Sequence, residues 1–253
     1  MAGQKTLIWA GIKATVDKSY SIFPLGDCAI TLDLGHLIDE QLNRKALSIQ
    51  EWLKAHAFPG LKDIIVAYSS VSIFYDPDMV RKQRDCPDGV YTYIRSLFEE
   101  AWAATGGLDV QVPSGELIRV PVCYGGKEGP DLEELSKAKN MTIEDIIQLH
   151  CSLIYRVYMI GFLPGFPYLG KVDARLETER KSRPVPVSAG GVGIAGNQTG
   201  IYPVNSPGGW QIIGRTPIKL FDRAASPPIK FAIGDRVLFY PISQEEFRSL
   251  CPG

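Results

Sequence analysis

The first hundred residues alternate short apolar runs with amphipathic stretches. Runs rich in β-branched and aromatic residues predict strands at Tyr20–Leu25 and Cys28–Asp33, with the turn pair Gly26-Asp27 between them. Asp39 belongs to a residue type that caps helices, and Pro59-Gly60 ends the stretch that follows it. Between them, one predicted helical face is apolar at steps of four and three residues: Leu42, Ala46, Ile49 and Leu53.

A second alternation follows. Strands are predicted at Asp63–Tyr68 and Val71–Tyr75, ended by Asp76-Pro77. An amphipathic helix is predicted from about Asp88 to Ala104, and Gly106-Gly107 terminates it. The predicted order ββαββα favours a small α+β layer of helices packed on a mostly antiparallel sheet.

The second half of the chain has a different pattern. A predicted strand at Glu116–Tyr124 precedes two helical segments, one around Leu132 and one that begins with the capping-box residues Thr142–Asp145. From Gly161 onward, turn residues recur between short runs that predict strands, for example Gly209–Ile213, Ile218–Phe221 and Arg236–Tyr240. Many short strands separated by Gly and Pro are typical of a closed or sandwiched β structure.

The change of pattern coincides with two turn-rich segments, Thr105–Gly107 and Pro113–Gly115. Domain boundaries commonly fall in such segments. We therefore predict an α+β domain over residues 18–108 and a β-barrel domain over residues 115–247.

Composition excludes several classes of protein. The 253 residues include 27 Lys+Arg and 28 Asp+Glu, and a net charge of −1 provides no electrostatic footprint for nucleic acid and no polybasic membrane anchor. The five cysteines lie far apart without a CxxC pair, which argues against a disulfide scaffold and a structural zinc site. Because neither a signal peptide nor a membrane span is evident, we expect a cytoplasmic protein.

One segment is both rich in glycine and free of charge. Gly161–Gly214 holds 11 of the 25 glycines, and Pro184–Gly214 contains no Asp, Glu, Lys, Arg or His. Glycine-rich backbone lets a ligand approach closely and offers N–H groups to an oxyanion. A β barrel also needs glycines at its corners and bulges, so a binding surface and a scaffold both remain open.

The binding interpretation predicts an anion-accepting cleft. Arg215 is the first charge after the neutral segment, and a guanidinium beside glycine-rich backbone is a natural clamp for a carboxylate or phosphate. Backbone N–H groups around Gly190–Gly196 would donate to the anion, whose charge would be the counter-charge of Arg215. Asn197 and Gln198 would add neutral donors, and Trp210 an apolar wall.

Familiar nucleotide motifs are absent or out of context. Gly191-Val-Gly-Ile-Ala-Gly196 matches GxGxxG, but the segment after it cannot start the helix that a dinucleotide fingerprint requires. The sequence has no GxxxxGK[ST], so any nucleotide must be held by something other than a P-loop. His150 and Cys151 are neighbours on a predicted helix and point about 100° apart, so they are not expected to act as a base and a nucleophile together.

Three long motifs occur in order along the chain. They are His150 with Tyr158-Met-Ile-Gly-Phe-Leu-Pro-Gly-Phe-Pro-Tyr-Leu-Gly170, then Gly193–Pro203, then Ser206–Pro217. Together with Pro24–Asp27, Tyr75–Pro77 and Val122–Gly126, they resemble the family of bacterial 5-oxoprolinase B-subunits. That family also goes by the names allophanate hydrolase subunit 1 and KipI kinase inhibitor, and it is similar to the carboxyltransferase C/D region of urea carboxylase. The resemblance covers about residues 20–245.

The resemblance implies a ferredoxin-like α+β domain followed by a cyclophilin-like β barrel. It also implies a hydrolase subunit that is inactive alone and that, with a KipA-like C-subunit and an A-subunit, opens the lactam of 5-oxoproline to glutamate. ATP would be a co-substrate of the complex, with no metal or organic cofactor on this chain. Among the residues that match the family motifs, the candidate catalytic residues are His150, Tyr158 and Arg215, and the candidate substrate-binding residues are Asn197 and Gln198. The predicted cleft adds Gly190, Gly193 and Trp210 to the substrate-binding candidates.

Two alternatives share the implied fold, and fold alone does not decide among them. One is a regulatory protein that binds and inhibits a sensor histidine kinase, and the other is an amide hydrolase subunit of the allophanate or urea amidolyase type. One stretch departs from the family pattern, because Arg183-Pro184 inverts a Pro-Arg pair, Ser188 replaces a proline and Gly191 replaces a serine. We therefore expect a site that is altered there, or an arginine that is re-aimed from position 183.

Overall fold

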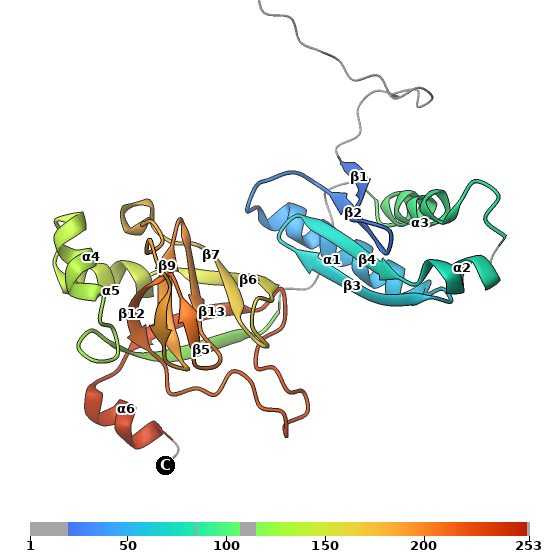
Figure 1. The fold of residues 1–253 in the computed structure, drawn as a ribbon. Coiled ribbons are helices and arrows are strands. Elements are labelled where there is room, and N and C mark those ends of the chain that lie inside the picture. The colour runs from blue at the N-terminus through green and yellow to red at the C-terminus, as the bar shows by residue number, and fades with distance from the viewer. Residues whose placement is uncertain (1–19, 84, 107–114, 252–253) are drawn as a thin grey trace, which may run out of the picture.

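The computed structural model of the protein describes residues 20–83, 85–106 and 115–251 (Figure 1). The chain forms two bodies, each around its own hydrophobic core, which we call the N-terminal body (residues 20–106) and the barrel body (residues 115–251). The predicted boundary falls on residues 107–114, which lie outside the described residues, so the domain limits 18–108 and 115–247 stay a prediction. In the described ranges no helix is both long enough and apolar enough to cross a membrane.

The N-terminal body is a four-stranded antiparallel sheet in the order β1-β2-β4-β3. Side chains that are neighbours across the strands, such as Ile30 and Ile73, bury the same face of the sheet against α1 and α3. In chain order the elements are β1 (Ser21–Pro24), β2 (Ala29–Asp33), α1 (Glu40–Ala55), β3 (Leu61–Ala67), β4 (Ser70–Tyr75), α2 (Pro77–Gln83) and α3 (Val90–Ala104).

Helix ends in this body follow from local sequence. The predicted cap of α1 is confirmed, since Asp39 accepts hydrogen bonds from the backbone N–H of Gln41 (2.8 Å) and Leu42 (3.1 Å). Helix α2 was not predicted, because Asp76-Pro77 was interpreted only as the end of a strand. In the structure Asp76 caps α2 through the backbone N–H of Met79 (3.1 Å), and Pro77 takes the first helical position, where its missing N–H costs nothing.

The barrel body closes seven strands in the order β10-β7-β6-β13-β5-β12-β9 (Figure 1). Strands β5 and β13 run parallel, and the other neighbouring pairs run antiparallel. The elements are β5 (Leu117–Tyr124), α4 (Leu132–Lys139), α5 (Ile143–Cys151), β6 (Ile154–Ile160), β7 (Pro167–Lys171), the 3-10 turn η1 (Ala174–Leu176), β8 (Val185–Val187), β9 (Gly191–Ala195), β10 (Gln198–Ile201), β11 (Ser206–Gly208), β12 (Gln211–Arg215), β13 (Arg236–Pro241) and α6 (Gln244–Leu250). A closed β structure beside an α+β body confirms the predicted fold class at this level.

Two details of the barrel body differ from expectation. The run Ile218–Phe221 is not a strand, and only an isolated bridge joins Phe221 to Ile229. Helix α6 was missed although Ser243 and Glu246 form its capping box, because the frequent turns before it favoured strands to the end of the chain. The expected capping box of Thr142 and Asp145 at the start of α5 is confirmed.

The first and last strands of the barrel are tied together by a side chain. Asp235, buried just before β13, accepts hydrogen bonds from the backbone N–H of Glu116 (3.0 Å), just before β5, and of Ala232 (2.8 Å). From there β13 pairs along β5 from Arg236 beside Leu117 to Pro241 beside Val122. This parallel pair completes the closed barrel.

Candidate functional site

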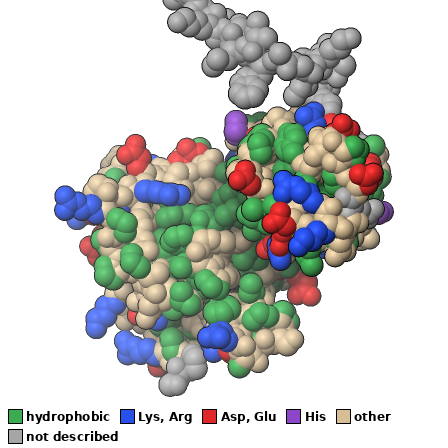
Figure 2. Space-filling model, turned by 45° about the vertical axis from the view of Figure 1, so that its right-hand side comes forward, with side chains coloured by type: hydrophobic (Ala, Val, Ile, Leu, Met, Phe, Trp, Pro, Cys, Tyr) green, Lys and Arg blue, Asp and Glu red, His purple; other side chains and the backbone are tan. Residues whose placement is uncertain are grey.

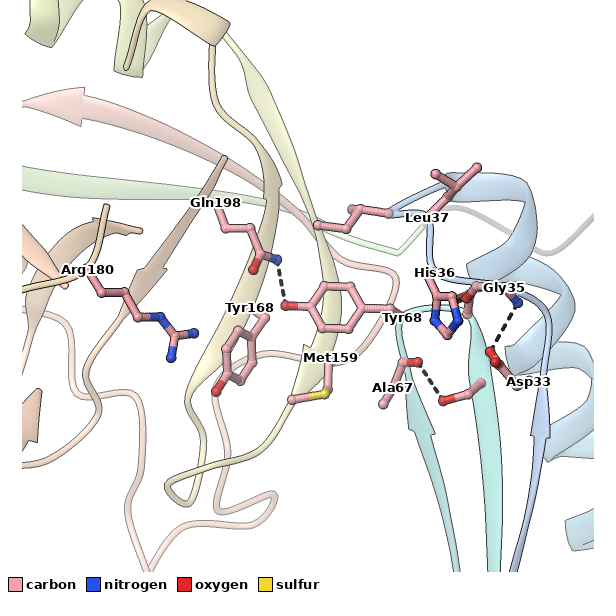
Figure 3. A pocket seen from close by; sticks show the side chains of 13 residues that line it. Asp33, Gly35, His36, Leu37, Ala67, Tyr68, Met159, Tyr168, Arg180 and Gln198 are labelled. Atoms are coloured by element: carbon pink, nitrogen blue, oxygen red, sulfur yellow. Dashed lines mark hydrogen bonds between the residues drawn. The ribbon is translucent and has the colours of Figure 1, made fainter. Parts of the chain in front are cut away.

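A cavity of about 500 Å³ lies where the two bodies meet, and we call it the junction cavity (Figure 3). The N-terminal body contributes the β3–β4 turn and the segment after β2, and the barrel body contributes β6, β7, β10 and the loop after η1. Its lining residues are Asp33, Gly35, His36, Leu37, Ile38, Ala67, Tyr68, Ser69, Ser70, Met159, Tyr168, Arg180 and Gln198.

Tyr68 reaches across this junction from a strained turn. It occupies the left-handed region with φ 51°, where a bulky side chain is rare, in the two-residue connection between β3 and β4. Its ring lies 6.2 Å from the ring of Tyr158 and 6.1 Å from that of Tyr168, and its hydroxyl accepts a hydrogen bond from Gln198 Nε2 at 2.5 Å. The turn therefore places one phenol of the N-terminal body among the side chains of the barrel body.

The phenols of the cavity are neutral at physiological pH. Burial raises the pKa of Tyr68 to about 12, and it also raises the pKa of Tyr168. The positive charge of Arg180 acts in the opposite direction on the pKa of both groups. Arg180 is therefore close enough for its field to reach both tyrosines, and each hydroxyl keeps a proton to donate.

A buried polar cluster holds the two bodies in register beneath Tyr68. Asn43 of α1 is fully buried, and its Nδ2 donates to the backbone carbonyls of Tyr68 (2.7 Å) and Tyr158 (3.0 Å). Arg156 of β6 donates from Nε to Asn43 Oδ1 at 3.1 Å and lies 3.5 Å from Glu40. Because each buried group has a partner on the other body, the cluster fixes the shape of the cavity wall.

The surface around the junction is largely apolar. In Figure 2, hydrophobic side chains gather along the groove between the two bodies, whereas most charged side chains lie farther out. Leu37, which lines the cavity, is a large hydrophobic side chain with more than half of its area exposed. A recess of this kind, with a few convergent polar groups, is the usual form of a small-molecule site.

The structure brings two of the predicted site residues to this cavity. Gln198 lines it directly, and Tyr158 supports it from beneath through the stacked ring of Tyr68. Tyr158 itself is buried, and burial raises the pKa of its phenol. Their roles in binding and proton transfer stay predictions.

His150 lies inside the barrel and not at the cavity. It is fully buried, with Tyr124 Oη at 2.8 Å from Nδ1 and Thr199 Oγ1 at 2.9 Å from Nε2. Desolvation by burial lowers its pKa to about 3, so the ring is neutral. A group enclosed in this way stabilises the barrel interior, and the predicted proton-handling role of His150 remains untested.

Arg215 lines a separate cavity of about 290 Å³ with Lys127, Glu128, Ser188 and Gly191. Its guanidinium donates from Nε to the carbonyl of Ala189 (2.7 Å) and pairs with Glu128 at 3.2 Å. The expectation that Arg215 lacks a counter-charge within the protein is therefore wrong. The departures at Ser188 and Gly191 also fall on this cavity and lie away from Gln198.

The glycines of the predicted cleft take part in the hydrogen bonding and close packing of the barrel body. The backbone N–H of Gly190 donates to Tyr202 O (2.7 Å), that of Gly191 to Ser188 O (3.0 Å) and that of Gly196 to Thr178 O (2.6 Å). The expectation that these N–H groups are available to an anion is therefore wrong. A side chain would also collide, since a Cβ at Gly190 would lie 2.2 Å from Thr216 O, and one at Gly193 would lie 3.0 Å from Ile212 Cδ1.

Trp210 and Asn197 also lie elsewhere. Trp210 is buried in an aromatic cluster outside the barrel core, with its ring 5.4 Å from Phe166 and 5.9 Å from Tyr168. Asn197 is half-buried at the turn between β9 and β10, where its backbone carbonyl accepts from Val172 N at 2.9 Å. Trp210 therefore supports Tyr168 from behind and does not form an open wall.

Sequence reasoning missed three residues that define the junction. Tyr68 was assigned to a strand end, and neither Asn43 nor Arg180 was among the predicted site residues. The pair Tyr68-Ser69 between two strand runs was an available signal for a tight turn, whereas nothing local marks Asn43 or Arg180. Over the described ranges, no three His, Cys, Asp or Glu side chains gather into a metal-binding group.

Comparison with known proteins identifies the class to which this fold and site belong. The family model of the carboxyltransferase domain, subdomain C and D, matches residues 20–231, and the chain belongs to this family. Within it, the 5-oxoprolinase B-subunit of Bacillus subtilis (strain 168) is 40% identical over 234 residues, which is 91% of this chain and 96% of that protein. The resemblance inferred from the three motifs is thereby confirmed.

Two further matches agree with this assignment. The 5-oxoprolinase B-subunit of Haemophilus influenzae is 36% identical over 220 residues, covering 87% of this chain and 96% of that protein. The crystal structure of TTHA0988 superposes with a TM-score of 0.69 at 33% identity over 85% of this chain. This chain spans only 40% of the length of TTHA0988.

Proposed function

We propose that this chain is the B-subunit of an ATP-dependent 5-oxoprolinase, which opens the lactam of 5-oxoproline to glutamate together with a KipA-like C-subunit and an A-subunit. The observation that carries the proposal is its identity of 40% with a protein named as a 5-oxoprolinase B-subunit, along 96% of that protein. A match along nearly the whole of both chains favours a shared role more strongly than a shared fold does.

The chemistry explains why ATP is part of the proposal. A lactam is a stable amide, and phosphoryl transfer from ATP to its oxygen makes the ring carbon open to attack by water. Cleavage of the C–N bond then leaves an acyl phosphate, which a second water hydrolyses to glutamate and phosphate. Hydrogen-bond donors and a cation must stabilise the charge that develops in these steps.

This chain supplies only part of that machinery. Its sequence lacks a P-loop, and the junction cavity offers neutral donors and one arginine to an open groove. We therefore place ATP, as co-substrate, on the assembled complex, and we expect the chain to need no metal or organic cofactor of its own. We also propose that the bodies are a ferredoxin-like and a cyclophilin-like domain and that the complex is cytoplasmic.

Reconstitution tests the proposal. The purified chain, the C-subunit and the A-subunit are assayed together and in every pair for glutamate formed from 5-oxoproline and for ADP released. We expect coupled turnover by the full set and none by this chain alone. Coupled turnover by the chain alone would contradict the split role, and no turnover by the full set would contradict the function.

A further inference from the structure

The junction cavity has opposite charges at its two ends. Arg180 extends from the barrel body on the Tyr168 side, and Asp33 lies on the N-terminal body beyond Tyr68 (Figure 3). Among the described residues no carboxylate lies within ion-pair distance of Arg180, whereas Asp33 Oδ1 accepts a hydrogen bond from Gly35 N at 3.0 Å. A bound anion is therefore attracted to the Arg180 end and repelled from the Asp33 end.

Between these ends, Gln198 and Tyr68 form a paired donor and acceptor. Gln198 Nε2 donates to the Tyr68 hydroxyl at 2.5 Å, so the hydroxyl proton points away from Gln198 and is available to another acceptor. Gln198 Oε1 receives no hydrogen bond from the described residues. The pair thus presents one acceptor and one donor side by side to the cavity.

That arrangement distinguishes a cyclic amide from an open-chain amide. In a small lactam the ring holds the amide bond cis, so its N–H and its C=O point to the same side. The lactam N–H can then donate to Gln198 Oε1 while its carbonyl accepts from Tyr68. An open-chain amide is trans and directs the two groups to opposite sides, so it satisfies only one of these contacts.

The wall around the pair is preorganised. The Tyr158 ring stacks on Tyr68 from beneath, and the amide of Asn43 holds the backbone carbonyl of Tyr68 at 2.7 Å. Met159 and Tyr168 add apolar surface for the carbon atoms of a ring. Because these side chains are already fixed, little conformational entropy is lost when a ligand binds.

We infer that the junction cavity is a binding site for a small cyclic amide that carries a carboxylate. Arg180 holds the carboxylate, Gln198 accepts from the lactam N–H, and Tyr68 donates to the lactam oxygen. This inference rests on the proposed function and assigns its substrate, 5-oxoproline, to a place on this chain. The ring fills only part of a cavity of about 500 Å³, and the remaining space lies open to a partner protein or to a phosphoryl donor.

Direct binding measurements separate the two halves of this site. Titration calorimetry and tyrosine-ring NMR are used on the full chain and on the reconstituted complex. The probes are 5-oxoproline, 2-pyrrolidone (the lactam without the carboxylate) and cyclopentanecarboxylate (the carboxylate without the lactam). We expect 5-oxoproline to bind at least 10-fold more tightly than either half-ligand and to shift the Tyr68 ring signals.

Variants assign each contact. Arg180→Gln should weaken 5-oxoproline about 10-fold or more and leave 2-pyrrolidone within twofold, since only the carboxylate contact is lost. Tyr68→Phe keeps the ring and the turn, and it should weaken both lactams severalfold and leave cyclopentanecarboxylate within twofold. Arg223→Gln removes an exposed arginine of the same body and is the matched control, with all three probes unchanged.

Two results would overturn the inference: no 5-oxoproline binding to the wild-type chain or complex, or binding that Arg180→Gln and Tyr68→Phe leave unchanged. Thermal melts of the variants show that each is folded before its affinity is compared. The proposed function fails separately, through absence of glutamate formation by the wild-type complex. A complex that turns over 5-oxoproline while tolerating both variants would place the substrate elsewhere and keep the function.

Discussion

Replacing Asn43 by alanine should loosen the junction between the two bodies. The substitution removes two hydrogen bonds to backbone carbonyls, at 2.7 and 3.0 Å, and one from the buried Arg156 guanidinium at 3.1 Å. A neutral hydrogen bond contributes about 1 kcal/mol net, and one to a charged group contributes about 1.5–3 kcal/mol. Water that enters the vacated space recovers part of this, so we expect a loss of about 3 kcal/mol in the free energy of unfolding.

Thermal and chemical denaturation measure this loss. In a protein of this size, 1 kcal/mol corresponds to about 2–4 °C in Tm, so the Asn43→Ala variant should melt about 6–12 °C lower than the wild type. Hydrogen exchange should also quicken in β6 and in the β3–β4 turn, because both contribute a carbonyl to the Asn43 amide.

Gln50 provides a matched control on the same helix. Its side-chain amide donates to the Ile64 carbonyl at 2.8 Å, a single contact within the N-terminal body. Gln50→Ala should therefore cost about 1 kcal/mol and leave exchange in β6 unchanged. Equal losses from the two substitutions, or unchanged exchange in β6 of Asn43→Ala, would refute the claim that this amide couples the bodies.

Three further predictions follow from the barrel body. In urea titrations, Gly190→Ala should lower the free energy of unfolding by about 2 kcal/mol more than Gly196→Ala. Both glycines have a positive φ, but only a Cβ at Gly190 would meet a backbone carbonyl, at 2.2 Å. Equal losses from the two substitutions would argue against that contact. Burial lowers the pKa of His150 to about 3, so the stabilisation from its neutral ring is complete above the unfolded pKa of about 6.5 and is lost as the pH falls toward 3. Between pH 7.5 and 4.5 the free energy of unfolding of the wild type should therefore fall by about 2–3 kcal/mol more than that of His150→Gln. Parallel pH profiles of the two proteins would contradict this. If the cavity at Arg215 holds a substrate anion, Arg215→Ala should lower kcat/KM of the reconstituted complex about 10- to 150-fold. Glu128→Gln should change kcat/KM less than about threefold. Equal losses from the two substitutions would mean that the Arg215–Glu128 pair, at 3.2 Å, is structural.

Local sequence signals predicted most of the fold. Asp39 capped α1 and Thr142 capped α5 as expected, because a cap depends only on residues within one turn of helix. The strands of the N-terminal body were also predicted, because residues that are alternately buried and exposed give the sequence an apolar period of two. Helices α2 and α6 were missed where a capping residue was hidden among turn residues.

The site was predicted less well, because its geometry depends on contacts between distant segments. Gln198 and Tyr68 are separated by 130 residues, and Asn43 and Arg156 by 113, so no local pattern relates them. The glycine-rich stretch, in contrast, led to a wrong expectation, that of backbone N–H groups available to an anion. Its lack of charge suggested a ligand surface, whereas Gly190 and Gly193 are small because neighbouring atoms leave no space for a side chain.

The parallel pairing of β5 with β13 imposes an order of events on a growing chain. The buried core residues of the N-terminal body all lie before residue 107, so that core can assemble while the ribosome is still making the barrel. Strand β5 emerges next but must wait for β13 more than a hundred residues later, and the Asp235 carboxylate reaches the N–H of Glu116 only then. Until that moment β5 presents an unpaired strand edge, which makes the nascent barrel the stretch most in need of protection from aggregation.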